Sequence, residues 1–266
     1  MKFYKILLKS ETVAKFVILL TTFILLSCSG NSSKENFHLY LLIGQSNMAG
    51  RGKISEQDTT VSPRVFTLNK EDKWVPAVDP IHFDKDIAGV GPGLSFGKAM
   101  AEQNPSVRIG LIPCAAGGSS IDVWKKGEYF SQTNSKPYDE AIRRTKIAMK
   151  DGVLKGILWH QGESDCKEGL AVQYKEKLIK LIKNLHKDLG TPEVPFVMAE
   201  LGEFYAANHP LSNEINKALH DVTEEVKNTV CVSAKGLSAK SDSTHFTASS
   251  ARELGKRYAE VFLKLN

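Results

Sequence analysis

The sequence predicts an α/β protein in which helices cover both faces of a mostly parallel, five-stranded sheet. First, five short apolar runs are nearly continuous, as in parallel strands that are buried on both faces. Second, segments with helical periodicity separate most of these runs, and such alternation is typical of parallel sheets. Third, glycine-rich and polar blocks follow the first three runs. Catalytic groups gather at that end of the strands in α/β proteins.

The expected strands and helices alternate along the chain. The strands are expected at 37–43, 107–113, 153–159, 195–201 and 229–233. The helices are expected at 94–102, 138–150, 170–189, 211–226 and from 247 to near the carboxyl end. The first helix follows a Gly-Pro-Gly turn, the second follows Pro137, and the third ends at Gly190. Residues 51–92 contain four prolines and are expected to form a long irregular insertion near the site.

The amino terminus has the order of a bacterial export signal. Four lysines precede the apolar run 16–26, which is too short to span a bilayer stably. The run ends in Leu-Leu-Ser-Cys, which resembles a lipoprotein signal in which Cys28 is lipidated and becomes the new amino terminus. We therefore expect a signal peptide over 1–27, a polar tether over 28–36 and export to a membrane surface. Ordinary secretion and an uncleaved anchor are the alternatives.

The composition fits one soluble domain, expected over 37–266. The chain has 266 residues, of which 42% are hydrophobic and 24% charged. Residues 1–27 hold four lysines and one glutamate, so their removal lowers the formal net charge from +5 to +2. A nearly neutral surface gives no reason to expect nucleic acid as a partner. Cys114, Cys166 and Cys231 are too widely spaced for a disulfide framework or a zinc site, although one bridge stays open.

Ser46 lies in a small-residue turn directly after the first expected strand. Gly44 and Gly50 flank it, which leaves room for a substrate and frees backbone N–H groups. A serine hydroxyl becomes an effective nucleophile when a base removes its proton. Ser46 is therefore the candidate nucleophile if the chain also supplies a base, an acid and oxyanion donors. Gln45 and Asn47 beside it are candidates for supporting the site.

Two later blocks offer oxyanion donors. Gly117 and Gly118 follow the second strand, where their backbone N–H groups would face the crevice, and Gln161 follows the third strand. Such neutral donors stabilise the negative charge of a tetrahedral intermediate. Glu163 is expected to orient a neighbour through hydrogen bonds. The alternative is that Glu163 and Asp165 are metal ligands.

Asp242 precedes His245 by three residues, just before the last helix. One turn of chain lets the Asp242 carboxylate accept a hydrogen bond from one imidazole nitrogen while the other nitrogen faces a serine. This arrangement fixes the tautomer and stabilises the imidazolium. His245 is therefore the expected base and Asp242 its acid partner. His160, which adjoins Gln161, is the competing base.

These four blocks resemble the sialate O-acetylesterase-like branch of the SGNH hydrolases, which includes the acetylesterases of carbohydrate esterase family six. The blocks are GQSNMAGRG, IPCAAGGSSIDVW, LWHQGESD and DSTHFT, in that order. The resemblance extends from about residue 37 to the carboxyl terminus. It implies a flavodoxin-like three-layer α/β/α sandwich and ester hydrolysis without a metal or another cofactor.

The resemblance also implies a role for each matching residue. The nucleophile is Ser46, the base is His245 and its acid partner is Asp242. The oxyanion hole consists of the Ser46 amide, the Gly118 amide in preference to that of Gly117, and the Gln161 side chain. We expect an exported serine esterase that removes acetyl groups from carbohydrates such as acetylated xylan or O-acetylated sialic acid. A general short-chain or lipase-like esterase and a non-catalytic carbohydrate-binding protein are the alternatives.

Overall fold

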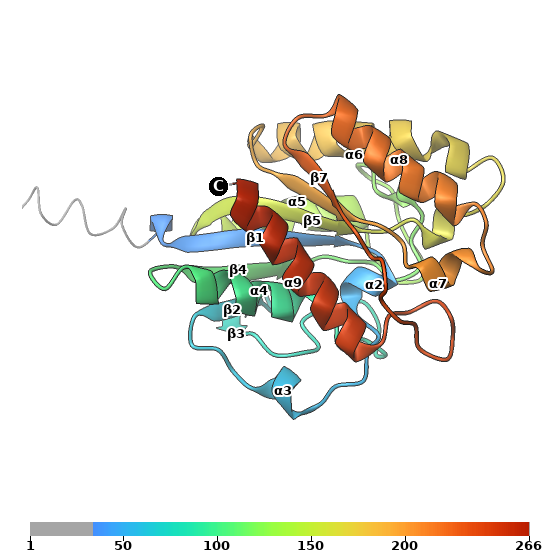
Figure 1. The fold of residues 1–266 in the computed structure, drawn as a ribbon. Helices are drawn as coiled ribbons and strands as arrows, with labels where there is room; N and C mark the ends of the chain where they lie inside the picture. The colour runs from blue at the N-terminus through green and yellow to red at the C-terminus, as the bar shows by residue number, and fades with distance from the viewer. Residues whose placement is uncertain (1–33, 266) are drawn as a thin grey trace, which may run out of the picture.

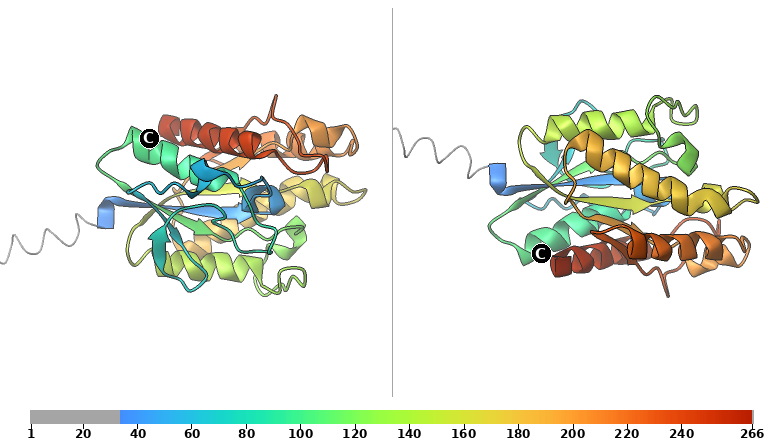
Figure 2. Two further views of the ribbon diagram at one scale, coloured as in Figure 1. Left: turned by 90° about the horizontal axis from the view of Figure 1, so that it is seen from below. Right: turned by 90° about the horizontal axis from the view of Figure 1, so that it is seen from above.

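The computed structural model describes residues 34–265, which form one seven-stranded sheet between two layers of helices (Figures 1 and 2). The strands are β1 (Phe37–Gly44), β2 (Val65–Leu68), β3 (Trp74–Pro76), β4 (Arg108–Pro113), β5 (Val153–His160), β6 (Phe196–Ala199) and β7 (Thr229–Val232). Their order across the sheet is β3-β2-β4-β1-β5-β6-β7, and every pair except β2–β3 is parallel. The expected signal peptide and most of the tether lie outside the described residues.

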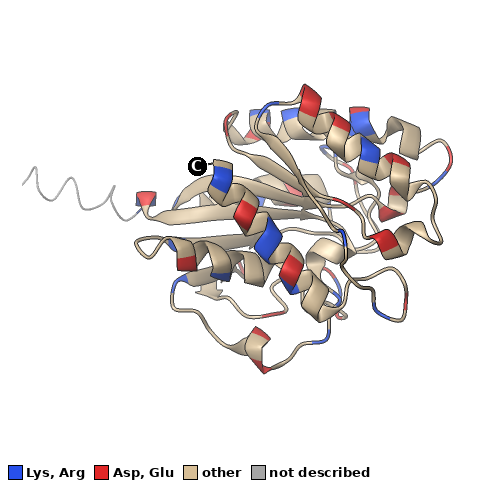
Figure 3. Ribbon diagram, in the orientation of Figure 1, with Lys and Arg blue, Asp and Glu red and all other residues tan. Residues whose placement is uncertain are grey.

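The helices differ widely in length. The long ones are α4 (Pro92–Gln103), α5 (Pro137–Ala148), α6 (Tyr174–Leu189), α8 (Ser212–Glu225) and α9 (Ala248–Leu265). The short ones are α2 (Ser46–Ala49), α3 (Glu56–Thr59) and α7 (Glu203–Ala206). Within residues 34–265, none of the helices is both long and apolar enough to cross a membrane. Basic and acidic residues alternate along α9 (Figure 3).

The five predicted strands and five predicted helices are confirmed, but the sheet has seven strands rather than five. The two additional strands, β2 and β3, lie in the segment expected to be an irregular insertion. Strand β2 has four residues and β3 has three, and β3 forms the antiparallel edge of the sheet. Runs this short, among prolines, carry too little periodicity to be recognised as strands.

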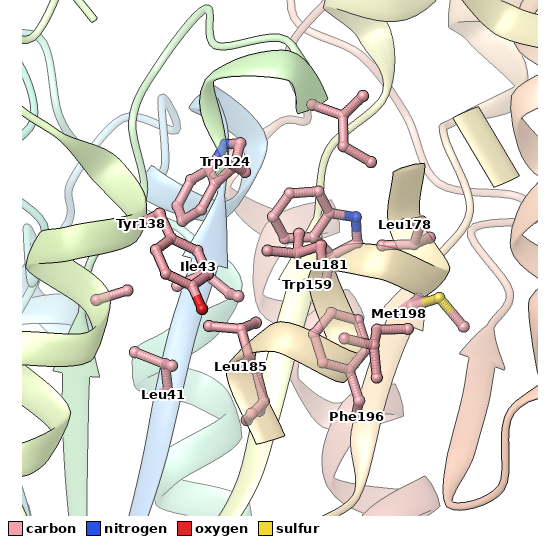
Figure 4. Close-up of a cluster of buried hydrophobic side chains, with 14 of the residues drawn as sticks. Leu41, Ile43, Trp124, Tyr138, Trp159, Leu178, Leu181, Leu185, Phe196 and Met198 are labelled. Carbon is pink, nitrogen blue, oxygen red and sulfur yellow. The ribbon is translucent and has the colours of Figure 1, made fainter. Parts of the chain in front are cut away.

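Alternating side chains of the central strand β1 enter two separate cores. Leu39 and Leu41 belong to the core under α5, α6 and α8, whereas Tyr40 and Leu42 belong to the core under α4 and α9. This alternation follows from the two-residue period of a strand. Figure 4 shows the first core, where Leu41 lies with residues of β5, β6 and α6. Burial on both faces explains why the strand is apolar from Leu39 to Ile43.

Apart from β2 and β3, the strand order β4-β1-β5-β6-β7 is flavodoxin-like, with β1 between β4 and β5. Leu42 pairs with Pro113 of β4, and Gly44 pairs with His160 of β5, so the three strands end at the same level. A side chain at Gly44 would not fit, because its Cβ would lie 2.1 Å from the His160 carbonyl oxygen. The polar blocks after the three strands therefore meet at one edge of the sheet.

The three cysteines of the described chain are free thiols, so the structure contains no bridge among Cys114, Cys166 and Cys231. Burial raises the pKa of the Cys114 thiol to about 11 and that of Cys231 to about 12. Thiols with raised pKa values are poor nucleophiles. They are therefore not candidates for catalysis.

Candidate active site

The Ser46 hydroxyl lies within hydrogen-bond distance of an imidazole. Ser46 is the first residue of α2, directly after β1, and only 6% of it is exposed. Its Oγ is 3.0 Å from Nε2 of His245, although 199 residues separate the two in sequence. The sheet brings the first strand and the loop before the last helix together, as predicted. This is the geometry in which an imidazole can remove the proton of a hydroxyl.

The other imidazole nitrogen of His245 faces Asp242. Nδ1 of His245 lies 3.0 Å from Oδ2 of Asp242. The second carboxylate oxygen accepts hydrogen bonds from the backbone N–H groups of Thr244, at 3.0 Å, and His245, at 2.9 Å. Although partial burial alone raises the pKa of Asp242, these amides and the imidazole hold it well below the usual range of a carboxyl group. Asp242 is therefore ionised at neutral pH and fixes the imidazole tautomer.

The competing base, His160, lies in a different environment. It is fully buried at the end of β5, and neither of its ring nitrogens has a hydrogen-bond partner among the described residues. Burial lowers its pKa. Its ring packs edge-on against Phe246, with centroids 5.5 Å apart. The structure thus places His245, and not His160, beside the Ser46 hydroxyl.

Asn47 connects the serine turn to two other blocks. Its Nδ2 donates hydrogen bonds to Oε1 of Glu163, at 2.5 Å, and to the carbonyl oxygen of Thr244, at 3.0 Å. Its Oδ1 accepts a hydrogen bond from the backbone N–H of Phe246 at 3.1 Å. Glu163 therefore orients Asn47, which matches the expected type of role for that carboxylate.

Two backbone N–H groups near Ser46 are free to bind an oxyanion. Those of Ser46 and Gly118 make no hydrogen bond to any residue within 34–265. The neighbouring N–H of Gly117, in contrast, donates to Oδ2 of Asp84 at 2.9 Å. Gly118 has a φ of +89°, which favours glycine and turns its peptide away from the extended path. The geometry is thus compatible with the preference for Gly118 over Gly117.

Gln161 is placed differently from the expectation. It is fully buried, and its Nε2 donates to the Ser119 carbonyl oxygen at 2.9 Å, to Oδ2 of Asp165 at 2.5 Å and to Oε1 of Gln45 at 3.1 Å. An amide nitrogen carries two hydrogens, so these three acceptors occupy both. In this structure the Gln161 side chain therefore directs its N–H groups into the protein and not toward the Ser46 hydroxyl.

The carboxylates of Glu163 and Asp165, considered as metal ligands, accept hydrogen bonds from different side-chain amides. Glu163 accepts from Asn47, whereas Asp165 accepts from Gln161 and from the backbone N–H of Ile121 at 3.0 Å. Burial raises the pKa of Asp165 to about 6. Across the described part of the chain, no three His, Cys, Asp or Glu side chains are grouped closely enough to hold a metal ion.

Sequence reasoning missed the groups that hold the end of β5. Three buried tyrosine hydroxyls donate to the backbone of β5 and of the loop after it: Tyr258 to the Trp159 carbonyl at 2.7 Å, Tyr174 to that of Gln161 at 2.8 Å, and Tyr205 to that of Glu163 at 3.0 Å. The three tyrosines come from α9, α6 and α7. A tyrosine on an apolar helix face looks like ordinary core, so no local signal reveals these contacts.

Arg51 was also missed as a supporting residue. Its Nη2 lies 2.7 Å from Oδ2 of Asp84, and both side chains are buried. Because Asp84 also accepts from the Gly117 amide, this ion pair attaches the insertion to the candidate oxyanion loop. The arginine in the first block, which reads GRG after the serine turn, was the available signal.

The chain matches proteins of known family. Residues 36–264 match a family model described as carbohydrate esterase, sialic acid-specific acetylesterase. A probable carbohydrate esterase of Arabidopsis thaliana is 33% identical over 246 residues, which cover 85% of this chain and 90% of the relative. An X-ray structure of that Arabidopsis protein superimposes with a TM-score of 0.77 at 32% identity, covering 86% of this chain and 98% of the other.

Two more distant structures share the fold. NanS superimposes with a TM-score of 0.72 at 15% identity, covering 88% of this chain and 98% of NanS. A carbohydrate acetylesterase from Xanthomonas citri superimposes with a TM-score of 0.66 at 20% identity, covering 83% of this chain and 55% of the other. At these identities the similarity concerns the fold alone.

Proposed function

Because this chain belongs to the carbohydrate esterase family of sialic acid-specific acetylesterases and is a carboxylic ester hydrolase, we propose that it removes O-acetyl groups from carbohydrates. The observation that carries the proposal is the line of hydrogen bonds from Asp242 through His245 to Ser46. Two unoccupied backbone N–H groups accompany it. These are the parts that acyl transfer by a serine nucleophile requires.

The proposed reaction begins with attack of Ser46 Oγ on the acetyl carbonyl carbon while Nε2 of His245 takes the hydroxyl proton. Asp242 stabilises the resulting imidazolium through Nδ1. The tetrahedral oxyanion accepts hydrogen bonds from the amides of Ser46 and Gly118. As the ester bond breaks, His245 gives its proton to the sugar oxygen. Water then hydrolyses the acetyl-enzyme by the same steps in reverse.

A cavity beside the loop after β4 supports a carbohydrate substrate. It has a volume of about 680 Å³, and its lining includes Phe83, Tyr129 and Asp84. The two aromatic side chains are unusually exposed, at 42% and 54%. Exposed aromatic rings with polar neighbours suit the mixed apolar and polar faces of a sugar. Asp84 also binds the Gly117 amide, so the cavity adjoins the candidate oxyanion loop.

Released acetate, measured across a panel of acetylated sugars, tests the function. We expect wild-type protein to hydrolyse acetylated xylo-oligosaccharide or O-acetylated sialic acid, and Ser46→Ala to hydrolyse neither. Chelation should leave kcat unchanged, because the proposed chemistry uses no metal. Hydrolysis of p-nitrophenyl acetate alone would instead indicate a general short-chain esterase. Loss of activity on chelation, restored by a divalent ion, would contradict the mechanism.

Tyr129→Ala tests the cavity separately. We expect a higher KM for acetylated oligosaccharides and an unchanged KM for p-nitrophenyl acetate, which has no sugar to place there. Leu263→Ala is the matched control, because Leu263 is a similarly exposed apolar residue, at 40%, near the end of α9. Equal KM values for Tyr129→Ala and wild type on every oligosaccharide would remove the cavity from the proposal.

We also propose that the protein is exported and anchored through lipid on Cys28, which rests on the order of the first 28 residues alone. Cys28→Ser should remain unprocessed or become soluble. Mass spectrometry of the mature wild-type protein checks this. An unmodified Cys28 within the mature chain would contradict the anchor.

A further inference from the structure

We propose that the side-chain amide of Gln45 is the third donor to the oxyanion, and that Gln161 is a positioning residue that holds Gln45 in place. The inference rests on the proposed function of Ser46 as an esterase nucleophile. It changes the assignment that the sequence suggested, in which Gln161 itself donates. The evidence is the direction of the hydrogen bonds that join the two glutamines.

The Gln161 amide has no hydrogen left for a substrate. Its two hydrogens are shared among the Ser119 carbonyl oxygen, the Asp165 carboxylate and the Gln45 amide oxygen. Turning one of them toward the crevice would remove a hydrogen bond from at least one of these buried acceptors, which is unfavourable. Exchanging the amide oxygen and nitrogen of Gln161 would place an oxygen against the Ser119 carbonyl. The orientation is therefore fixed by its neighbours.

Gln45 has the opposite pattern. Its Oε1 accepts hydrogen bonds from Nε2 of Gln161, at 3.1 Å, and from the backbone N–H of Ser164, at 3.3 Å. Two donors on one oxygen identify that atom and fix the plane of the amide. Nε2 of Gln45 then faces away from both donors and makes no hydrogen bond to any described residue. Nε2 of Gln45 is also not fully enclosed, so part of its surface stays accessible.

The location of this free amide suits an oxyanion donor. Gln45 directly precedes Ser46, whose backbone N–H is itself unoccupied. The Gln161 nitrogen that binds Gln45 also binds the carbonyl of Ser119, the residue after Gly118. Gln161 thus links the Gln45 amide to the loop that contains Gly118. A neutral, nearly buried donor, with 3% of the residue exposed, is held ready without reorganisation.

Gln132 is the rival amide near the same loop. Its Oε1 accepts from Nζ of Lys85 at 3.0 Å, and it lies 2.8 Å from the position that a Cβ on Gly118 would take. Gln132 is exposed, however, and only a lysine side chain orients it. A solvent-exposed amide is a weaker oxyanion donor than a buried, preorganised one.

Gln45→Glu is the sharpest variant. Glutamate keeps an oxygen in place for Gln161 and Ser164 but replaces the free N–H₂ group with a second, negatively charged oxygen. We expect kcat for p-nitrophenyl acetate to fall by at least about 10²–10³-fold, with KM changed little, because an oxyanion donor is lost. Gln45→Ala should lower kcat by a similar factor. Gln132→Glu, the matched charge control on the other side of Gly118, should retain most of the activity.

The double variant separates positioning from direct donation. If Gln161 acts through Gln45, then Gln161→Ala lowers kcat by itself, and Gln45→Ala/Gln161→Ala is no slower than Gln45→Ala. Circular dichroism and urea midpoints confirm that each variant is folded. Near-normal kcat in folded Gln45→Glu, beside an inactive Ser46→Ala, would overturn the Gln45 assignment and leave the esterase proposal intact. Wild-type kcat in Ser46→Ala would overturn both.

Discussion

Oδ1 of Asn47 accepts a hydrogen bond from the backbone N–H of Phe246 at 3.1 Å, so the residue after the candidate nucleophile holds the residue after the candidate base. Nδ2 of Asn47 reaches the carbonyl of Thr244 on the other side of the imidazole. One buried amide therefore fixes the backbone on both sides of His245. The 3.0 Å approach of Ser46 and His245 depends on this contact between segments far apart in the chain.

Replacing Asn47 by aspartate should misplace the imidazole. The new carboxylate would keep an acceptor for Phe246, but its second oxygen would face Oε1 of Glu163 and the Thr244 carbonyl, both acceptors. A buried polar contact left unsatisfied costs about 1–3 kcal/mol, which corresponds to about 5–150-fold in kcat if all of it acts on the barrier. Kinetics on p-nitrophenyl acetate and urea unfolding measure both effects.

The double variant Asn47→Asp/Glu163→Gln is the control for that prediction. Its glutamine can donate to the new carboxylate, so the contact between positions 47 and 163 is restored with the donor on the opposite side. We expect part of the lost kcat to return. A double variant that is no more active than Asn47→Asp would show that the role of Asn47 lies elsewhere.

His245→Ala should remove nearly all turnover, whereas Asp242→Asn should reduce kcat less, because the imidazole itself remains.

The pKa of Asp242 is lower in the folded protein than in the unfolded chain, so its charge stabilises the fold above the unfolded pKa of about 4. That contribution disappears as the pH falls through the lower, folded pKa. The difference in Tm between wild type and Asp242→Asn should therefore be larger at pH 7 than at pH 3. A difference independent of pH would contradict the carboxylate's role.

The positions of the candidate catalytic groups were predictable because a parallel sheet places the ends of its strands together. Ser46 and the blocks after β4 and β5 each follow an apolar run, and the strand register then brings them to one edge. Asp242 and His245 were predictable because three residues separate them. In each case a short stretch of sequence indicates the candidate residue, and the strand arrangement of the fold class brings these stretches together.

The hydrogen bonds of the glutamines could not be predicted in the same way. The direction of the Gln161 amide depends on the Ser119 carbonyl and on Asp165, and the first of these comes from another strand's loop. The hydrophobic pattern of the sequence does not indicate which of the two side-chain amides, that of Gln45 or that of Gln161, keeps a free N–H. The same holds for β3, whose three residues pair only because β2 offers an open edge.

Arg252 should be among the more sensitive positions outside the site. Its Nε and Nη2 donate to the two oxygens of Asp58, each at 2.7 Å, which joins α9 to the insertion. Although burial alone raises the pKa of Asp58, the hydrogen bonds from Arg252 and Ser55 lower it to about 2. Arg252→Ala leaves a buried carboxylate without its cation, and we expect a loss of about 3–5 kcal/mol in urea unfolding. Asp58→Asn/Arg252→Ala should recover much of that loss; equal losses in both variants would show that the charge is not responsible.

Asp79 should make the folded protein less stable as the pH rises. It is 4% exposed, and its Oδ1 has no hydrogen-bond partner among residues 34–265. Burial, and then the neighbouring Asp58 carboxylate, raise the pKa of Asp79 to about 8. Between the unfolded pKa of about 4 and this value, the unfolded chain releases a proton that the folded protein keeps. The free energy of unfolding therefore decreases over that range and levels off above about pH 8.

Asp79→Asn removes this titration while keeping nearly the same shape. The variant and the wild type should have similar urea midpoints at pH 4. At pH 9 the variant should be more stable by about 2–5 kcal/mol, since each pKa unit corresponds to about 1.4 kcal/mol. Asp86→Asn, an exposed substitution of the same kind in the same segment, controls for the change in net charge and should leave the pH dependence unaltered. A parallel loss of stability in wild type and Asp79→Asn between pH 4 and pH 9 would contradict this prediction. It would show that the Asp79 carboxyl is already ionised in the folded protein and that its charge is stabilised there.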